Sequence, residues 1–197
     1  MERRHSSRET LFRGAAELFA VNGFHGTGMA DLERATGLSR GSIYHHVTSK
    51  DDLLFGITTE YLCRLIESGD ELLGQDLPAQ QRLRLFSRRV LQEIMDHLPE
   101  MTVCFRDLHA VQDDRREQVL DLHRKYEQVW ADMLHRGAEE GVFDPSLVSP
   151  LAVKALLGLH HYAYIWARPN GPMSPDAIGD VFTDLVLNGL LPRLEAR

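Results

Sequence analysis

Residues 27–54 of this chain read TGMADLERATGLSRGSIYHHVTSKDDLL and carry the clearest structural signals among its 197 residues. Thr27 is placed to cap a short helix, and Gly37 follows where a helix end needs a residue that tolerates positive φ. Ser39 is placed to cap the next helix, in which Ile43 faces inward. The spacing predicts two short helices joined by a tight turn, the second of which is free to enter the major groove of DNA.

This pattern resembles the N-terminal DNA-binding domain of the TetR family of bacterial one-component regulators. The matching positions, which run in step without a gap, are Thr27, Ala35, Gly37, Leu38, Ser39, Gly41, Ile43, Tyr44, His46, Ser49, Lys50, Asp51 and Leu53. The chain departs from the family at Gly28, Glu33 and Val47, where a second Thr, a small Ala and a Phe are usual. The resemblance implies that the second helix is a recognition helix.

The predicted DNA-contacting residues combine the exposed positions of this helix with the contact positions of the family. They are Thr27, Gly28, Ser39, Arg40, Ser42, Tyr44, His45, His46 and Lys50. The resemblance makes Tyr44 and Lys50 phosphate contacts, and a packed aromatic is the alternative for Tyr44. Arg40 suits bidentate readout of guanine, with a non-specific phosphate clamp as the alternative. For His46, the alternative to a contact is a half-buried structural role.

The net charge of −7 is unevenly distributed along the chain. Residues 1–50 hold seven Arg and Lys against five Asp and Glu, which leaves 15 against 24 for residues 51–197. The basic residues expected near phosphates are Arg3, Arg4, Arg8, Arg40 and Lys50. We expect the first part to dock on DNA and the acidic remainder to be repelled by it. This division is also the predicted domain boundary.

The rest of the chain predicts helices only. Ser6 with Glu9, and Ser49 with Asp52, have the spacing of capping boxes that open helices. Apolar residues at helical spacing predict further helices over residues 78–98, 100–110, 113–139, 149–167 and 175–191. The predicted fold is therefore all-α with about nine helices, in which a three-helix helix-turn-helix domain precedes a larger bundle. The resemblance assigns effector binding and dimerisation to that bundle.

Residues 164–175, YIWARPNGPMSP, resemble a linker found in one TetR subgroup, which includes regulators of fatty-acid and sterol degradation. In that subgroup a Trp-x-Arg-Pro-x-Gly-Pro stretch joins the last two helices. The apolar residues after it, which would supply a dimer face, are Ile178, Val181, Phe182, Leu185, Val186 and Leu190. A homodimer with two-fold symmetry suits a palindromic operator in double-stranded DNA.

Aromatic and polar residues of the predicted bundle suggest a ligand pocket, and a plain hydrophobic core is the alternative. The residues are Tyr61, Phe86, Phe105, Tyr126, Trp130, His161, Tyr162 and Trp166. The resemblance favours a pocket, because TetR-like regulators hold an effector in this bundle and release DNA when it binds. From the likeness of the final quarter we expect a hydrophobic carboxylic acid or its coenzyme A thioester, with an aromatic or drug-like ligand as the runner-up. Arg106, Arg124 or Arg168 would meet a charged end.

Ten histidines raise the question of a metal. Glu93 with His97, and His123 with Glu127, are spaced four residues apart, and His160-His161 would add a ligand. Amphipathic helices produce such pairs by chance, and neither Cys-x-x-Cys nor His-Glu-x-x-His reinforces them. We therefore predict no metal and no cofactor.

Other classes of protein fit the sequence less well. The chain has no Gly-x-Ser-x-Gly elbow, phosphate loop or dinucleotide fingerprint, so we do not expect an enzyme. An architectural DNA-binding protein would share the basic first part but would hardly need a larger acidic body. A ligand-responsive repressor uses every part of the chain, although an activator would make the same groove contacts.

The sequence also bears on location. No apolar run approaches the roughly 18 residues needed to span a bilayer. The N-terminus leads directly into an amphipathic helix rather than a signal peptide. We expect a cytoplasmic protein with no membrane partner.

Overall fold

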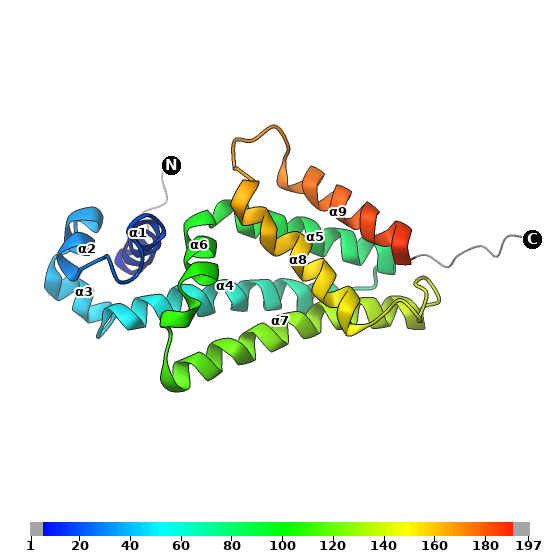
Figure 1. Ribbon diagram of the computed structural model, residues 1–197, viewed down its shortest axis with the longest axis horizontal. Helices are drawn as coiled ribbons and strands as arrows, with labels where there is room; N and C mark the ends of the chain where they lie inside the picture. The colour runs from blue at the N-terminus through cyan, green and yellow to red at the C-terminus, as the bar shows by residue number, and fades with distance from the viewer. Residues whose placement is uncertain (1–5, 191–197) are drawn as a thin grey trace, which may run out of the picture. The chain divides into compact units, whose positions relative to one another are not determined.

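The computed structural model describes residues 6–190, with the side chains of residues 189 and 190 excepted, and this range is helical without strands (Figure 1). The elements are α1 (Ser7–Asn22), α2 (Met29–Thr36), α3 (Arg40–His46), α4 (Lys50–Leu73), α5 (Ala79–Asp96), α6 (Leu98–Arg106), a 3₁₀ turn η1 (Leu108–Ala110), α7 (Asp113–Glu139), α8 (Pro150–Trp166) and α9 (Pro175–Leu190). The predicted all-α class is confirmed. None of these helices is long and apolar enough to cross a membrane. Arg3 and Arg4 lie outside the described residues.

The chain divides into two compact units, and each contains segments distant in sequence. The first, which we call the head unit, holds the described residues up to Leu62 together with His97–Leu122. The second, the bundle unit, holds Cys63–Asp96 together with the described residues from His123 onward. Helices α4 and α7 each contribute one end to the head unit and the other to the bundle unit.

Local signals set the helix ends as the sequence predicts. The Ser6 hydroxyl accepts the Glu9 N–H at 3.2 Å, and the Glu9 carboxylate accepts the Ser6 N–H at 2.9 Å. The box that opens α4 is present too, since the Ser49 hydroxyl accepts the Asp52 N–H at 3.2 Å. Each cap satisfies backbone donors that helix geometry leaves without partners, and is worth about 1 kcal/mol.

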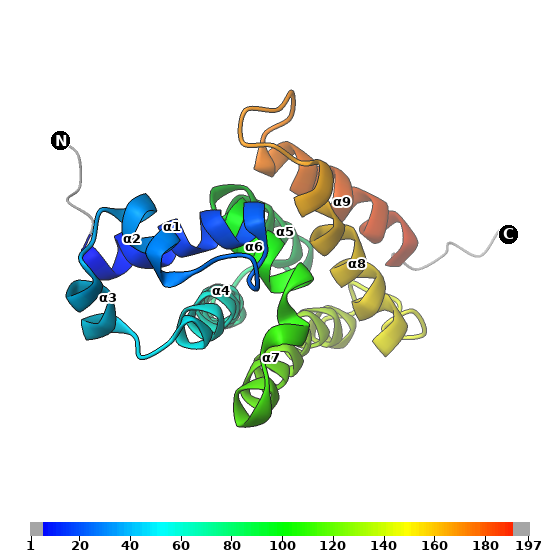
Figure 2. The ribbon, with the colours of Figure 1, turned by 60° about the vertical axis from the view of Figure 1, so that its left-hand side comes forward.

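In the head unit, α1 packs against α2, α3 and α6, and Figure 2 shows α2 and α3 beside α1. The core side chains come from one face of each of these helices and include the fully buried Leu11, Phe19, Leu32 and Ile43. Burial of these four side chains contributes roughly 2 kcal/mol each to the stability of the folded head unit. This packing keeps α2 and α3 folded, since helices of their length are not stable alone. The head is thus a scaffold that presents α3.

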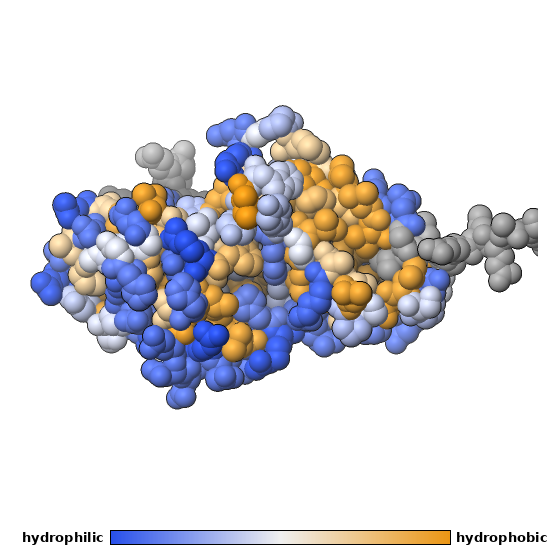
Figure 3. Space-filling view, viewed as in Figure 1, coloured by the Kyte–Doolittle hydropathy of each residue, from blue (hydrophilic) through white to orange (hydrophobic). Residues whose placement is uncertain are grey.

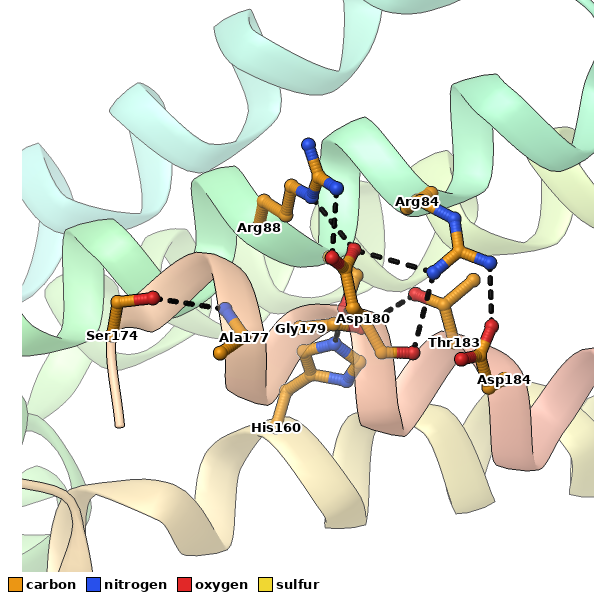
Figure 4. A network of polar contacts seen from close by, with 10 residues as sticks. Arg84, Arg88, His160, Ser174, Ala177, Gly179, Asp180, Thr183 and Asp184 are labelled. Atoms are coloured by element: carbon orange, nitrogen blue, oxygen red, sulfur yellow. Dashed lines mark hydrogen bonds and ion pairs between the residues drawn. The ribbon is translucent and has the colours of Figure 1, made fainter. Parts of the chain in front are cut away.

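In the bundle unit, α9 packs along α5, and α8 contacts both helices. Gly179 allows this approach, because a Cβ there would lie 2.9 Å from the Arg88 backbone. Charged residues reinforce the contact: Arg88 binds Asp180 with two 2.7 Å hydrogen bonds, and Arg84 contacts Asp180 and Asp184 (Figure 4). Helix α9 is therefore fixed to α5 by both packing and paired charges.

One predicted stretch differs from the structure. The helix expected over residues 100–110 begins earlier and is split into α6 and the 3₁₀ turn η1. Helix α5 ends at Asp96, and His97 is the N-cap of α6. Pro99 occupies the first turn of α6, where its missing N–H is tolerated, so the break falls two residues before the position expected.

Candidate DNA-contacting surface and effector site

The turn between α2 and α3 has the geometry of a helix-turn-helix. Gly37 ends α2 in the left-handed conformation, at φ 68° and ψ 8°. The Ser39 hydroxyl then accepts the Ser42 N–H at 3.2 Å and caps α3. Ile43 is fully buried beneath this helix, while Arg40 projects into solvent. Helix α3 is therefore anchored on one side and open on the other, as groove entry requires.

The open side of α3 is basic and aromatic. Arg40, Tyr44 and His45 are all exposed, and the Arg40 guanidinium lies 5.7 Å from the centre of the Tyr44 ring. With 43% of its surface exposed, Tyr44 is placed for contact rather than for core packing. His46 is half-buried, and its Nε2 lies 2.8 Å from the Ser7 hydroxyl of α1. The structure thus gives His46 a role in seating α3 on α1.

Lys50 is placed differently from a simple phosphate contact. Its ammonium donates to the carbonyl oxygens of Phe24 at 2.7 Å and Thr27 at 2.9 Å. The same ammonium lies 4.3 Å from the centre of the Phe24 ring. Two of its three N–H donors therefore hold the loop between α1 and α2, and one is left for a phosphate. The sequence contained no signal for this role, because the carbonyl oxygens lie 23 and 26 residues earlier.

Two predicted contacts at the start of α2 need correction. Thr27 does not cap α2: it is 1% exposed, and its hydroxyl donates to the Gly23 carbonyl oxygen at 3.0 Å. The N-cap is Gly28, whose N–H is taken by the Asp31 carboxylate at 2.8 Å. The buried Thr27 hydroxyl is therefore not available to a phosphate, and the exposed Gly28 N–H already has an acceptor. Arg34, which is exposed and paired with Asp31 at 2.5 Å, is the cation that α2 offers instead.

Asp52 organises the turn that follows the recognition helix. One carboxylate oxygen accepts the Ser49 N–H at 3.1 Å and the Thr48 N–H at 2.6 Å, as well as the Thr48 hydroxyl. The other oxygen accepts the guanidinium of Arg115, which belongs to α7. These contacts lower the pKa of Asp52 to about 2. The hydrogen bond from the Thr48 hydroxyl contributes most to this shift, and Arg115 contributes as well. The sequence predicted the capping box but not the arginine.

In the bundle unit, part of the predicted effector set forms one aromatic cluster. The Phe86 and Trp130 ring centres lie 4.6 Å apart, and Tyr126 lies 6.3 Å from Phe86. His161 stacks on Tyr126 at 5.7 Å with an interplanar angle of 23°. Gly69 of α4 gives the cluster room, because a Cβ there would lie 2.2 Å from the Val129 side chain and 3.1 Å from Phe86. These aromatic side chains come from three helices and pack around one face of α7.

That face of α7 carries buried polar atoms without partners. By distance and angle, the Tyr126 hydroxyl, the Trp130 indole nitrogen and the Nε2 of His123 form no hydrogen bond with the described residues. The Trp130 N–H nevertheless lies near enough to the phenol oxygen of Tyr126 to lower the pKa of Tyr126 slightly. The three side chains are spaced three and four residues apart, so they share one side of the helix. Nearly all buried polar groups in folded proteins are hydrogen-bonded, which makes three on one helix face unusual. They are suited to a ligand that brings its own acceptor.

The cluster is electrically neutral near physiological pH. Burial lowers the pKa of His160 to about 4. Burial, together with repulsion from His160 and His123, lowers the pKa of His161 to about 3. Burial likewise lowers the pKa of His123 and raises that of the Tyr126 phenol, the latter despite a smaller opposing effect of Trp130. The site therefore offers hydrogen bonds and ring surfaces but no charge.

Both parts of the chain match family models. A model described as bacterial regulatory proteins, tetR family, matches residues 11–57, which include α2 and α3. A second, described as tetracyclin repressor-like, C-terminal domain, matches residues 76–190, more than half of the chain. The chain belongs to the TetR family. It is accordingly a DNA-binding transcriptional regulator, and its outward-facing α3 is the recognition helix of that domain.

Known relatives of this TetR regulator match it over nearly its whole length. The HTH-type transcriptional repressor KstR2 of Mycobacterium tuberculosis is 26% identical over 189 residues, 94% of each chain. The structure of KstR2, a ketosteroid transcriptional regulator, has a TM-score of 0.86 at 25% identity and covers 96% of this chain and 97% of that one. The structure of the regulator PfmR of Thermus thermophilus has a TM-score of 0.83 at 30% identity, and the match covers 92% of this chain and 99% of PfmR. AibR, solved with isovaleryl coenzyme A and operator DNA, shares the fold with a TM-score of 0.76 at 20% identity, covering 96% and 100%.

Other predicted effector residues of this TetR regulator lie apart from the aromatic cluster. Tyr162 is 62% exposed, and Trp166 lies one turn further along the same outer side of α8. The residues that α8 turns inward are instead His160 and Ala163. Because a helix has 3.6 residues per turn, a side chain two positions from His160 faces outward. Tyr162 and Trp166 are thus surface residues in the single chain and do not line an interior pocket.

Arg106 and two further predicted residues belong to the head unit. The Arg106 guanidinium donates to the carbonyl oxygens of Phe19 and Ala20, the latter at 2.8 Å, and to Asp107 at 3.1 Å. It supplies the positive charge that the last turn of α1 lacks, so its donors are engaged at a helix end. Tyr61 and Phe105 lie in the same unit, Tyr61 being buried. Arg124 and Arg168 are exposed.

The carboxylates considered for a metal have other partners in this TetR regulator. Glu93 pairs with Arg64 at 2.5 Å, and Glu127 pairs with Lys154 at 2.6 Å. His97 lies outside α5, so it does not share a helix with Glu93 as the spacing suggested. Within residues 6–190, no group of three His, Cys, Asp or Glu side chains is arranged to hold a metal ion.

Replacing Asp52 with asparagine should destabilise the head unit at about pH 7 by up to about 2 kcal/mol. Because the pKa of folded Asp52 is lowered from 3.8 to about 2, its charged form stabilises the folded state, and this contribution disappears as the pH falls through that interval. The difference between Asp52→Asn and the native chain in chemical unfolding should therefore shrink between about pH 7 and about pH 3. Asp70→Asn, which changes an exposed carboxylate of α4, is the control. A difference that does not vary with pH would contradict this account.

Proposed function

We propose that this TetR regulator is a repressor that binds a palindromic operator as a homodimer and leaves it when a small hydrophobic effector binds. The observation that carries the effector part is the set of buried, unpartnered polar atoms on α7, in His123, Tyr126 and Trp130. A protein that only bound DNA would gain stability by replacing them with apolar groups. An activator would use the same α3, and the position of the operator relative to the promoter separates the two. We place the regulator in the cytoplasm with its operator.

The effector is proposed to present an uncharged acceptor oxygen to the cluster, as the carbonyl of an acyl coenzyme A thioester does. Two unpartnered donors, the Tyr126 hydroxyl and the Trp130 indole N–H, suit a carbonyl oxygen. Neutral His160 and His161 offer no charge to a free carboxylate. The AibR complex with isovaleryl coenzyme A supports a thioester by analogy, and the name of KstR2 points to a ketosteroid-related ligand, which also carries a carbonyl. A drug-like aromatic ligand remains the runner-up.

The dimer is proposed to form through α8 and α9. Figure 3 shows hydrophobic residues gathered on the surface where Figure 1 places these two helices. The exposed large apolar side chains there are Leu151, Tyr162, Ile165, Trp166, Val181 and Leu185. An apolar patch of this kind on a soluble chain marks an interaction surface. Of the six residues predicted for the face, Ile178 is instead buried within the unit, and the side chain of Leu190 lies outside the described set.

Release requires that the effector bind the non-operator conformation more tightly than the operator-bound one. A coupling of about 1–3 kcal/mol would lower operator affinity by roughly 5–150-fold. Helix α7 is the element suited to this coupling. It carries the unpartnered groups in the bundle unit and Arg115, the partner of Asp52, in the head unit.

Replacing Tyr126 with phenylalanine should weaken effector binding while leaving the ligand-free protein as stable or more stable. The change removes a buried hydroxyl without a partner, whose burial is unfavourable by about 1–3 kcal/mol unless a ligand binds it. The two tryptophans are Trp130 and Trp166, so in a Trp166→Phe background the emission reports on Trp130 alone. Titration with isovaleryl coenzyme A and longer acyl thioesters measures binding, and the corresponding free acids should bind more weakly.

The matched control is Tyr162→Phe, which removes a hydroxyl from the proposed dimer face of α8, away from the cluster, and should leave effector binding unchanged. Operator release is followed in parallel by fluorescence anisotropy of labelled DNA. If saturating effector changes Trp130 emission but never alters operator affinity, the proposed function is wrong. Equal weakening by Tyr162→Phe and Tyr126→Phe would remove α7 from the effector site.

A further inference from the structure

A buried polar junction joins three helices of the bundle unit at Ser87 of α5, His160 of α8 and Gly179 of α9 (Figure 4). The Ser87 hydroxyl oxygen lies 2.7 Å from the Nε2 of His160 and 3.0 Å from the Gly179 carbonyl oxygen. Ser87 and His160 are at most 1% exposed, so bulk water offers them no alternative partner. The two side chains therefore depend on groups of the protein for their hydrogen bonds.

The Ser87 hydroxyl has two acceptors in reach but only one proton, so the junction has two discrete hydrogen-bond arrangements. The Nδ1 of His160 lies 2.8 Å from the Leu156 carbonyl oxygen. When Nδ1 carries the proton of the neutral ring, Nε2 accepts from Ser87, and the hydroxyl joins α5 to α8. When Nε2 carries that proton, it donates to Ser87, and the hydroxyl donates to Gly179 and joins α5 to α9. The junction thus favours either α8 or α9 without any side chain leaving it.

The imidazole of His160 also contacts both the aromatic cluster and α9. Its ring centre lies 4.8 Å from that of Trp130, a member of the cluster, and 5.4 Å from that of Phe182 on α9. Both ring nitrogens have hydrogen-bond partners, so the ring cannot turn without losing one of them. A buried ring held in this way passes a displacement of Trp130 on to α9, because a close-packed interior leaves little room to absorb it.

We propose that His160 couples the aromatic cluster to the dimer face of α9, and that the Ser87 hydroxyl is the two-state element of this coupling. The coupling rests on the proposed effector site and dimer face, and it extends the action of the effector to the dimer itself. Effector binding and dimerisation then change each other's free energy by the same amount. His160 is a positioning residue, because it acts on the effector only through Trp130.

The ligand-free test uses the full chain labelled with fluorotryptophan, whose two fluorine NMR resonances come from Trp130 and Trp166. The variant Trp166→Phe assigns them. We expect Leu185→Asp, which disrupts the proposed dimer face, to shift the resonance of buried Trp130. Adding Ser87→Ala should abolish this shift, because the two-state hydroxyl is gone. A direct effect of the new carboxylate would persist in the Ser87→Ala background and would overturn the coupling.

Thr183→Val is the matched control. The Thr183 hydroxyl is also buried and donates to the same Gly179 carbonyl oxygen at 2.7 Å, but both residues belong to α9, so it joins no second helix. This variant should keep the Trp130 response, and circular dichroism confirms that each variant is folded. Equal loss of the response in Thr183→Val and Ser87→Ala would show a general loosening of α9, which would overturn the role of Ser87.

The second measurement is the dimer dissociation constant with and without isovaleryl coenzyme A, by fluorescence-detected sedimentation. We expect a change of about fivefold or more in the native chain and in Thr183→Val, and of at most about twofold in Ser87→Ala. If effector releases the operator while neither the dimer dissociation constant nor the Trp130 resonance responds, the coupling is wrong and the proposed function stands. If isovaleryl coenzyme A does not bind, the proposed effector class is wrong, and the fluorine resonance alone decides the coupling. A Leu185→Asp protein that stays dimeric would overturn both the dimer face and the coupling.

Discussion

Replacing Leu185 with aspartate should yield a monomer that binds the full operator roughly 100-fold more weakly, or worse. Leu185 is 61% exposed on α9, in the apolar patch that also contains Val181. A carboxylate buried at the centre of a dimer interface would lose its hydration without gaining a partner. Each monomer would then hold one recognition helix, so the second half-site would no longer be bound intramolecularly.

Sedimentation velocity at several protein concentrations measures the oligomeric state directly. Val21→Asp introduces the same charge at another exposed apolar residue, in α1 of the head unit, and should leave the dimer intact. The Leu185→Asp monomer should bind an isolated half-site as well as the native chain does. A Leu185→Asp protein that remains dimeric would show that α9 is not the interface.

Replacing Arg40 with alanine should weaken operator binding by about 1–3 kcal/mol per half-site and relax the preference for one base pair. Arg40 lies in the first turn of α3 and is exposed, and its guanidinium lies over the neighbouring Tyr44 ring. Its guanidinium is therefore available to present two parallel donors to a guanine edge. The loss should appear on the operator far more than on random DNA.

Arg40→Lys separates the two readings of this residue. Lysine keeps the charge but cannot make the planar bidentate contact, so a guanine reader would lose discrimination and a phosphate clamp would retain it. Competition with operators altered at single base pairs measures this directly. Arg116→Ala, at an exposed position of α7, controls for the loss of one positive charge. Retained operator preference in Arg40→Lys would assign Arg40 to the phosphate backbone.

Helix positions and helix ends were predictable because they depend on neighbouring residues. Ser6, Ser39 and Ser49 cap the helices that their spacing predicted, and Gly37 has the left-handed conformation expected of it. The expected exposure of Arg40 and burial of Ile43 are both found in the structure. Thr27 was the exception, because its hydroxyl donates to the carbonyl oxygen of Gly23, the C-cap of α1, and does not cap α2.

The roles of several charged side chains were not predictable from local spacing. Lys50 was predicted as a phosphate contact and Arg106 as an effector contact, and the structure adds that both donate to backbone carbonyl oxygens of distant segments. Arg115 gave no signal at all, although it binds Asp52 from 63 residues away. The residues next to an Arg or Lys in the sequence do not show whether its side chain binds another part of the protein or a ligand.

By itself the sequence determined the all-α class, the helix-turn-helix and the exposed face of its recognition helix, because capping and helical period act within a few residues. Only the tertiary structure decided which polar side chains have hydrogen-bond or ion-pair partners within the protein and which do not. It buried polar groups of His123, Tyr126 and Trp130 on one face of α7 and turned Tyr162 outward. Hydrogen-bond partners and cavities arise where distant segments meet, and the folded chain alone brings those segments together.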